Sequence, residues 1–169
     1  LDVEDLIEEE QCVYTLTDSG YIKRTPASEY RQQGRGGKGN KAMSTKEEDC
    51  VSTVFTASTH DYILFFTNTG RAYRKKGYQI PASGKTARGT NIVNILPVEP
   101  GEKVTAMLHV KSLEDDSVLM MVTRKGTVKR LPLNVLNTAR KAGIRCITLE
   151  EGDELICVRE TDGEQALLI

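Results

Sequence analysis

Seven consecutive residues near the first quarter of the chain combine types that suit contact with an anion. They are Gln33, Gly34, Arg35, Gly36, Gly37, Lys38 and Gly39. Glycine costs a folded chain conformational entropy, and it is used where backbone N–H groups must approach a ligand closely. Together with two cations, such amides could hold the phosphates of a nucleic acid. The same composition is also typical of a disordered Gly/Arg segment, so the surrounding elements must decide between the two interpretations.

These residues lie in one of three basic segments of a chain whose formal net charge is only −1. Residues 19–46, 70–90 and 124–145 hold seven, six and seven lysines and arginines, and Glu29 is the single acid among them. The rest of the chain holds the other acids with three cations. If the three segments fold onto one surface, that surface is strongly positive, which is the electrostatic footprint of a nucleic-acid-binding protein.

The basic segments recur because the chain repeats itself. An apolar stretch, a Thr-x-x-Gly sequence and a shorter stretch that ends in cations recur at residues 13–24, 63–74 and 119–130. A glycine after two polar residues supplies the positive φ angle of a tight turn between antiparallel strands. We therefore predict three β-hairpins, with their turns at Gly20, Gly70 and Gly126.

Each hairpin is followed by the same succession of features. A basic loop with glycine comes first, at residues 35–39, 85–89 and 138–143. A third apolar stretch follows at residues 92–96 and 144–149, and it is weak in the first copy. An acidic turn and a fourth strand then close each copy. Four strands with a period of about fifty residues are typical of a propeller-like blade.

The repeats predict an all-β fold of about three four-stranded blades. We place these blades approximately at residues 11–57, 61–110 and 117–160, with the start of a fourth at 165–169. Because one blade cannot bury its sheet alone, we interpret the chain as part of a longer array. Unpaired strand edges at residues 1–10 and 165–169 would then allow two copies of the fragment to associate.

The repeat places cations at equivalent positions, on the second strand and in the loop after it. Repetition around a ring would make these cations a continuous basic rim for DNA. No set of residues suited to reading base edges is visible, so we expect binding to be largely independent of sequence. The rim cations that we expect to bind DNA, besides those of the glycine-rich stretch, are Lys23, Arg24, Lys41, Arg74, Lys75, Lys76, Lys85, Arg88, Lys129, Arg130, Arg140 and Lys141.

The stretch from Gln33 to Gly39 resembles the gyrase-A box, Q-R-R-G-G-K/R-G, of the A subunits of bacterial DNA gyrases. Gly34 stands where that family usually has arginine. The resemblance extends over nearly the whole chain, including the sequences at residues 5–7, 28–30, 59–61, 87–90 and 152–156. It implies the first half of a six-bladed β-pinwheel, a propeller relative in which neighbouring blades exchange strands. It also implies that double-stranded DNA wraps around the perimeter, with the box as an anchor in the first blade.

The resemblance further implies a place in an A2B2 holoenzyme with the rest of the gyrase A subunit, together with the gyrase B subunits. That enzyme performs ATP-dependent negative supercoiling, and it uses ATP and Mg in other domains, so we expect no cofactor and no catalytic residue in this chain. The matching domain of topoisomerase IV is an alternative, although there the box is typically degraded or missing. The implied location is the cytoplasm, on the nucleoid.

Other classes of function find little support in the residues. The cysteines at positions 12, 50, 146 and 157 form no C-x-x-C pair, and His60 and His109 stand apart, so we expect no metal site. No apolar run approaches the ~18 residues of a membrane span, and the acidic N-terminal stretch is unlike a signal peptide. A propeller that binds proteins remains an alternative from a different class, and a free-standing enzyme is the weakest one.

Overall fold

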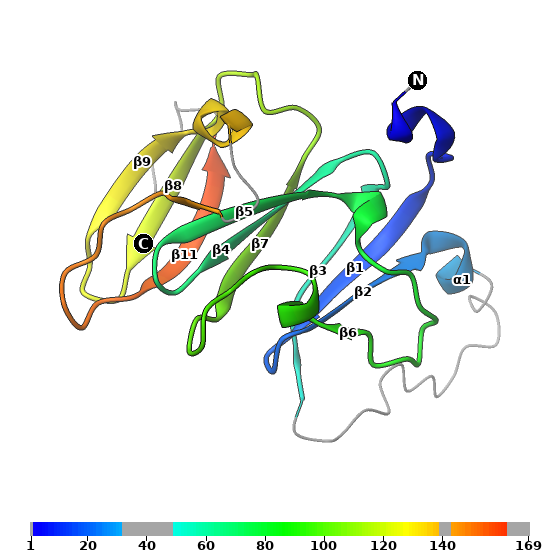
Figure 1. Cartoon of the computed structure of the whole chain (residues 1–169), viewed down its shortest axis with the longest axis horizontal. Coiled ribbons are helices and arrows are strands. Elements are labelled where there is room, and N and C mark those ends of the chain that lie inside the picture. Colours follow the sequence, from blue (N-terminus) through cyan, green and yellow to red (C-terminus); the bar gives the residue numbers. More distant parts are fainter. Residues whose placement is uncertain (1, 32–48, 139–142, 162–169) are drawn as a thin grey trace. The chain divides into compact units, whose positions relative to one another are not determined.

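The computed structural model describes residues 2–31, 49–138 and 143–161, and these fold as antiparallel strands joined by short helical turns (Figure 1). They form two compact units. The first unit comprises the described residues up to Asp61 together with Lys75–Leu96. The second comprises Tyr62–Arg74 and the described residues from Pro97 onward. The predicted all-β fold is therefore confirmed.

The first unit contains one four-stranded sheet with the order β3-β1-β2-β6. Its strands are β1 (Gln11–Thr17), β2 (Tyr21–Pro26), β3 (Val51–Ser58) and β6 (Thr90–Asn91). The short helical elements of this unit are η1 (Val3–Leu6), α1 (Ala27–Arg31), η2 (Gly77–Gln79) and η3 (Ile92–Asn94). The side chains of Tyr14, Leu16, Ile22 and Ile80 are buried and form its apolar centre.

The second unit contains two sheets. The first has the order β10-β5-β4-β7 and is built from β4 (Tyr62–Thr67), β5 (Arg71–Lys76, whose last two residues belong to the first unit), β7 (Val104–Val110) and β10 (Ile144–Arg145). The second has the order β11-β8-β9 among the described residues, with β8 (Val118–Thr123), β9 (Val128–Pro132) and β11 (Leu155–Thr161). A 3-10 helix, η4 (Leu133–Thr138), follows β9.

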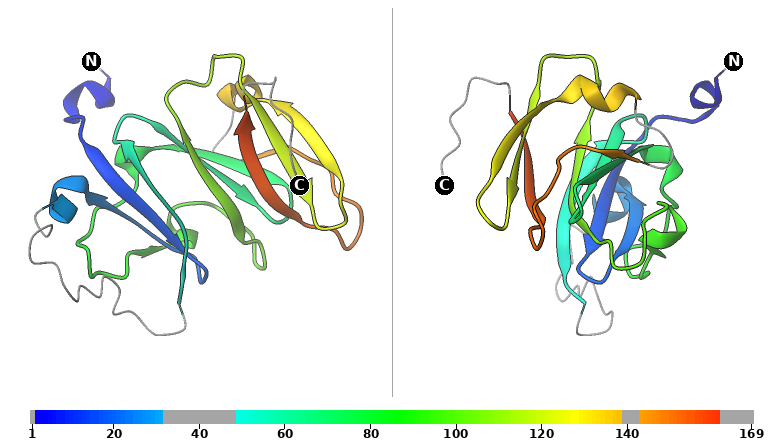
Figure 2. Two further views of the ribbon diagram at one scale, coloured as in Figure 1. Left: turned by 180° about the vertical axis from the view of Figure 1, so that it is seen from behind. Right: turned by 60° about the vertical axis from the view of Figure 1, so that its left-hand side comes forward.

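One apolar core joins the two sheets of the second unit. It includes Leu64 and Phe66 from the first sheet and Leu119, Met121 and Leu155 from the second, all fully buried. Alternate residues of a strand point to the same face, so Leu64 with Phe66 and Leu119 with Met121 each present two side chains to this core. Figure 2 shows the sheet of β8, β9 and β11 beside that of β4, β5 and β7.

The three predicted hairpin turns are confirmed. Gly20, Gly70 and Gly126 have φ angles of 93°, 91° and 96°, which L-residues rarely adopt. In each turn the threonine of the Thr-x-x-Gly sequence accepts a hydrogen bond from the N–H group four residues later, over 3.1, 3.3 and 3.1 Å. The shared side-chain bond explains why threonine recurs at this position of the repeat.

The third strand of a sheet comes from the sequence that follows the next hairpin. β6 pairs with β2, with Thr90 opposite Ile22, and β10 pairs with β5, with Ile144 opposite Ala72. This pairing agrees with the strand exchange that the family resemblance implied. The third strand predicted at residues 92–96 is wrong in position, because β6 ends at Asn91 and η3 follows it. The one predicted at 144–149 begins where expected but is too long, because β10 ends at Arg145.

The second copy shows why a longer third strand does not form. Asn91 caps a helical turn by accepting a hydrogen bond from the Val93 N–H over 3.1 Å. The Leu96 N–H then donates to the Ile92 carbonyl over 2.9 Å, and both side chains are buried. The apolar residues of this stretch are therefore spaced for one helical turn, which a short run cannot distinguish from a buried strand.

No helical turn in the described part of the chain has the length and apolar composition to cross a membrane.

Candidate nucleic-acid interface

Part of the predicted interface lies outside the described residues. This part comprises the whole glycine-rich stretch, Gln33 to Gly39, together with Lys41, Arg140 and Lys141; the start of a fourth blade at 165–169 lies outside as well. The structure describes the other predicted cations, and it gives them three different environments.

Lys23 is the one predicted rim cation that is buried among the described residues, with 4% of its surface exposed. Its ammonium donates hydrogen bonds to the carbonyl oxygens of Gly84 (3.2 Å), Lys85 and Ala87 (2.9 Å). Burial lowers the pKa of Lys23 because it disfavours the charged form, and the charge of Glu29 opposes this effect. The geometry makes Lys23 a support for the loop at residues 84–88 and leaves its ammonium little access to a phosphate.

The loop that Lys23 supports carries two predicted rim cations on aromatic rings. The Lys85 ammonium lies 5.0 Å from the centre of the Tyr30 ring, and the Arg88 guanidinium lies 3.9 Å from that of Tyr21. Cations over aromatic faces are attracted by the ring and restricted in position. Arg88 is exposed, so its stacked guanidinium is presented to solvent in a restricted orientation.

Arg24 and Arg74 occupy equivalent repeat positions and make equivalent contacts. Arg24 Nε donates to the Ile80 carbonyl over 2.8 Å, just after η2. Arg74 Nη1 donates to the carbonyls of Leu136 (3.3 Å) and Asn137 (3.0 Å) in η4, and its guanidinium lies 5.6 Å from the Tyr62 ring centre. Each arginine thus holds the helical turn of the following copy in place. A guanidinium has five N–H donors, so each arginine keeps further donors for a phosphate.

The remaining described cations are at the surface or partly exposed. Lys129 and Arg130 lie exposed on β9, and Lys75 is half-buried at the end of β5. Lys76 Nζ lies 3.3 Å from Glu4 Oε1 and donates to the His60 carbonyl over 3.0 Å.

Two further arginines face each other in the second unit, and neither is among the rim cations predicted from the sequence. Arg71 on β5 is directly opposite Arg145 on β10. They border a hollow of about 330 Å³ whose other lining residues are Thr69, Glu99, Pro100, Gly101 and Glu102. Arg71 Nη1 lies 3.6 Å from Glu99 Oε2 and 3.9 Å from Glu102 Oε1. Both arginines belong to the basic segments, so charge was a signal, but only the pairing of distant strands brings them together.

Acids in the predicted turns stabilise the hairpins of their own sheets. The Glu102 carboxylate accepts hydrogen bonds from Thr67 Oγ1 (2.7 Å), Thr69 Oγ1 (3.1 Å) and the Glu99 N–H (2.8 Å). Burial by itself raises the pKa of Glu102, but these bonds and the charge of Arg71 outweigh it and hold the pKa below its ordinary value. Glu102 is therefore a structural carboxylate in a hydrogen-bonded turn.

The other two copies carry an acid at the matching position. Asp49 accepts a hydrogen bond from the Ser19 N–H over 3.1 Å, and bonding to Ser19 and Thr17 lowers the pKa of Asp49. Asp153 accepts one from the Lys125 N–H over 2.9 Å. Desolvation raises the pKa of Asp153, yet bonds from Thr123 and backbone amides leave it lowered.

Among the described residues no group of histidine, cysteine, aspartate and glutamate side chains is arranged to hold a metal ion. Cys12, Cys50, Cys146 and Cys157 are all free thiols.

Comparisons with known proteins bear on the whole chain. A family model described as "DNA gyrase C-terminal domain, beta-propeller" matches residues 13–58, 61–111 and 117–159. The DNA gyrase A subunit of Clostridium acetobutylicum is 48% identical over 169 residues, which cover 100% of this chain and 20% of that protein. The chain spans about a fifth of the length of the curated relatives it matches.

Two solved structures resemble the fold. The C-terminal domain of DNA topoisomerase IV has a TM-score of 0.79 and 26% sequence identity, and the match covers 93% of this chain and 47% of that one. The DNA gyrase A C-terminal domain has a TM-score of 0.69 and 27% identity, over 90% of this chain and 48% of that one.

Proposed function

The chain belongs to the DNA gyrase C-terminal domain family, and from this we propose that it binds double-stranded DNA and wraps it around a basic perimeter. One observation carries the proposal: in each of three copies matched by the family model, cations follow the hairpin turn. The loop with Lys85 and Arg88 is the best-defined part of this surface. Its cations lie against tyrosine rings, and Lys23 fastens its backbone.

Wrapping requires that phosphate contacts exceed the cost of bending. Smoothly bending 20–30 base pairs by 40–90° costs on the order of 1–6 kcal/mol. Each phosphate neutralised by lysine or arginine releases counterions and favours the complex, and the gain falls as salt is added. A track of cations repeated at a fixed interval supplies such contacts without reading the base sequence.

The glycine-rich stretch completes the proposed surface as its anchor. In this role Arg35 and Lys38 neutralise phosphates, while the backbone N–H groups of Gly36, Gly37 and Gly39 approach the DNA. Gln33 belongs to the same motif, and Gly34 removes the cation that the family usually carries there. The proposed track continues through Arg24, Lys41, Arg74, Lys75, Lys76, Lys129, Arg130, Arg140 and Lys141.

The names of the relatives support a proposal about the whole protein. We place the chain in the gyrase A subunit, within an A2B2 holoenzyme that introduces negative supercoils with ATP bound in other domains, in the bacterial cytoplasm. The blades proposed at residues 11–57, 61–110 and 117–160 would then continue in further copies. Self-association of this fragment also stays a proposal, and its test is the mass in solution. Residues 2–10 do not supply the expected strand edge, because η1 occupies Val3–Leu6.

A second candidate is the equivalent domain of topoisomerase IV, which the structural match to that domain favours. The curated relatives matched at 46–48% identity are A subunits of DNA gyrase, and the nearly complete box also favours gyrase. Handed wrapping can be measured on this chain, because nicked circular DNA that ligase seals on a wrapping protein acquires a change in linking number.

The test is DNA binding to the chain over a range of salt, with ligase closure of relaxed circles on the same protein. We expect the affinity for a duplex of arbitrary sequence to fall steeply with salt, with a slope of about −0.9 for each phosphate neutralised. A binding constant that stays level between low and moderate salt would contradict the basic perimeter. Salt-dependent binding without any change in linking number would support DNA binding and contradict wrapping.

A further inference from the structure

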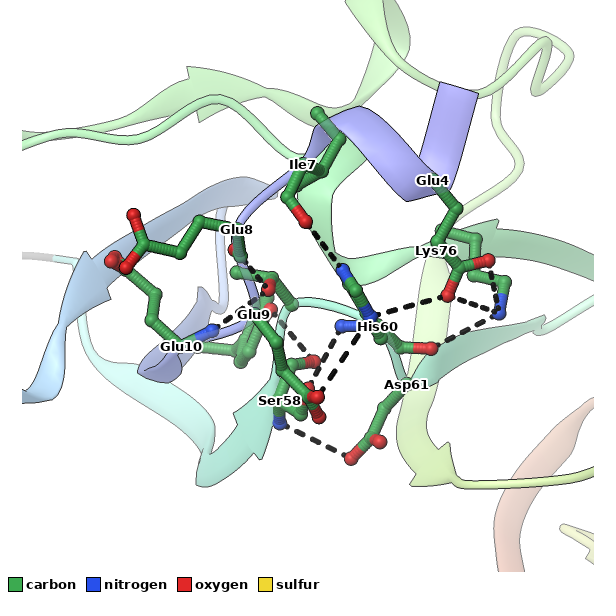
Figure 3. A network of polar contacts seen from close by, with 11 residues as sticks. Glu4, Ile7, Glu8, Glu9, Glu10, Ser58, His60, Asp61 and Lys76 are labelled. Atoms are coloured by element: carbon green, nitrogen blue, oxygen red, sulfur yellow. Dashed lines mark hydrogen bonds and ion pairs between the residues drawn. The ribbon is translucent and has the colours of Figure 1, made fainter. Parts of the chain in front are cut away.

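An acidic segment at residues 2–10 folds back onto a predicted DNA-contact cation. This segment holds six acids, and the turn at residues 58–61 lies beside it with Lys76 (Figure 3). All of these residues belong to the first unit. We call residues 2–7 the strap.

Three side chains hold the strap. His60 Nε2 lies 2.9 Å from the Ile7 carbonyl oxygen, so this nitrogen carries the proton and donates. His60 Nδ1 lies 3.5 Å from Glu4 Oε2 and 3.9 Å from Glu9 Oε1. Glu4 also pairs with Lys76, over 3.3 Å. Glu4, His60 and Lys76 form the latch, and Figure 3 shows the Glu4 carboxylate between the His60 ring and the Lys76 ammonium.

A second set of bonds fixes the chain immediately after the strap. The Thr59 N–H donates to the Glu10 carbonyl over 2.9 Å, and the Glu10 N–H donates to Thr59 Oγ1 over 3.1 Å. Ser58 Oγ donates to the Glu9 carboxylate over 2.7 Å. Residues 8–10, which lead into β1, are thus tied to Ser58 and Thr59 at the end of β3, and they would remain in place if the latch opened.

Apolar burial contributes little to holding the strap. Val3 and Leu6 of η1 are 61% and 74% exposed, and no residue of η1 is buried. Partly exposed ion pairs are worth little in water and are screened by salt. Ile7 is the one half-buried apolar residue of the strap, so another polyanion could replace Glu4 at Lys76 and expose little apolar surface.

We propose that the strap competes with the DNA backbone for Lys76, so that DNA binding releases residues 2–7 from the latch. This inference rests on the proposed function, because it assigns a regulating contact to one cation of the same surface. Carboxylates of the strap and phosphates of DNA present the same chemistry to the Lys76 ammonium. The strap thereby weakens DNA binding at this position until the phosphates displace it.

The first test compares two variants that remove one charge from the same segment. Glu4→Gln removes the carboxylate that pairs with Lys76. Glu8→Gln is the matched control, because the Glu8 side chain is exposed and extends away from the latch in Figure 3. With a duplex of about 30 base pairs at low salt, we expect Glu4→Gln to bind about two- to five-fold tighter than Glu8→Gln, the range of a partly exposed ion pair. Equal affinities of the two variants would overturn the proposal.

The second test follows the strap itself by amide hydrogen exchange. The Ile7 N–H donates to the Glu4 carbonyl over 3.1 Å within η1, so its exchange reports release of the strap. We expect exchange in residues 2–7 to accelerate in the wild-type chain when saturating DNA is added. His60→Ala should show fast exchange without DNA. Unchanged or slower exchange of the strap on a DNA-saturated chain would contradict the competition.

The two tests separate this inference from the proposed function. If DNA binds with steep salt dependence while Glu4→Gln matches Glu8→Gln, only the competition is wrong. If none of the variants binds DNA, the proposed function is wrong and the competition falls with it.

Discussion

Residues at one position of the repeat meet different surroundings. Lys23, Tyr73 and Lys129 each stand three residues after a hairpin glycine. Lys23 and Tyr73 are 4% and 2% exposed, whereas Lys129 is exposed. A loop from the following copy covers the first two: a Cβ on Gly89 would lie 3.0 Å from Lys23 Cβ, and one on Gly143 would lie 2.7 Å from the Tyr73 ring. Among the described residues, the side chain three residues after the hairpin glycine is therefore packed in the copies where a loop of the following copy covers it.

A cation that is exposed and ordered is a better candidate for phosphate contact than a buried one. Arg88 meets both conditions through its stacking on Tyr21. We expect Arg88→Gln to weaken DNA binding about two- to ten-fold at low salt and to lower the salt slope by about 1, as loss of one phosphate contact does. Arg159→Gln is the control, because Arg159 is exposed on β11 and lies outside the basic segments.

Binding titrations over salt measure both variants, and urea unfolding checks that Arg88→Gln changes stability by no more than about 1 kcal/mol. An Arg88→Gln chain that binds DNA like Arg159→Gln would remove this loop from the interface.

The role of a residue could be predicted from the sequence when its contacts are with its neighbours in the chain. It could not be predicted when its contacts are with distant segments. The hairpin glycines were predictable, because a positive φ angle is a local requirement. The burial of Lys23 was not, because its partners at Gly84, Lys85 and Ala87 are more than sixty residues away in the chain. Charge alone placed Lys23 among the DNA contacts, and only the loop that folds over it gives it a supporting role.

At the scale of elements, the hairpin turn and the acidic turn act as one unit in each copy. Thr67 shows the arrangement: its hydroxyl donates to Glu102 and accepts from the Arg71 N–H. Gly70 closes the same turn and packs against the segment that follows β10. A Cβ at Gly70 would lie 2.6 Å from the Ile147 carbonyl oxygen, and the Gly70 carbonyl accepts a hydrogen bond from the Cys146 N–H over 2.8 Å.

Gly70→Ala therefore introduces both backbone strain and a steric clash. We expect a loss of about 1–3 kcal/mol in the free energy of unfolding, because φ is +91° there and the neighbouring atom is backbone. Gly84→Ala is the matched control, since a Cβ there meets nothing within 4 Å. Chemical denaturation measures both. A Gly70→Ala chain as stable as Gly84→Ala would show that the turn relaxes freely.

The type of an element could be predicted where its apolar pattern is long. The prediction failed where the pattern covers only a few residues. The first strand of each hairpin is six or seven residues long and mostly apolar, and β8 alternates partly buried and buried residues along its whole length. β6 and β10 are two residues long, and their pairing is decided by contact with β2 and β5 rather than by their own sequence. The apolar residues after β6 favoured a strand at 92–96, and the Asn91 cap turned that stretch into a helical turn.

At the scale of the whole molecule, the segregation of charge serves two purposes. Acids at the matching positions Asp49, Glu102 and Asp153 accept hydrogen bonds from the hairpin turns, whereas the cations follow the hairpins and are mostly exposed or partly exposed where described. A formal net charge of −1 is thus compatible with a DNA-binding surface, because the acids are placed where they stabilise the fold. The same acids make the stability of the chain depend on pH.

The pKa values of all three acids are lowered in the folded chain. A carboxyl group whose pKa is lower when folded stabilises the fold at pH above its unfolded-state pKa, and this contribution is lost as the pH falls through the folded-state value. We therefore expect the free energy of unfolding to be level near neutral pH and to fall below about pH 4, where unfolded aspartate and glutamate begin to bind protons. Denaturant midpoints measured from pH 7 to pH 2.5 check the direction.

Glu102→Gln tests the contribution of the buried turn acid to this pH dependence, because the Glu102 side chain is 2% exposed. We expect it to cost about 1–3 kcal/mol at pH 7, where the charged hydrogen bonds are lost, and progressively less as the pH falls. Glu99→Gln is the control, since its side chain is 72% exposed and pairs with the same Arg71 at the surface. If Glu102→Gln and Glu99→Gln gave parallel curves from pH 7 to pH 2.5, the hydrogen-bonded carboxylate would not be the source of the acid sensitivity. A wild-type chain that gained stability in acid would contradict the role of all three turn acids.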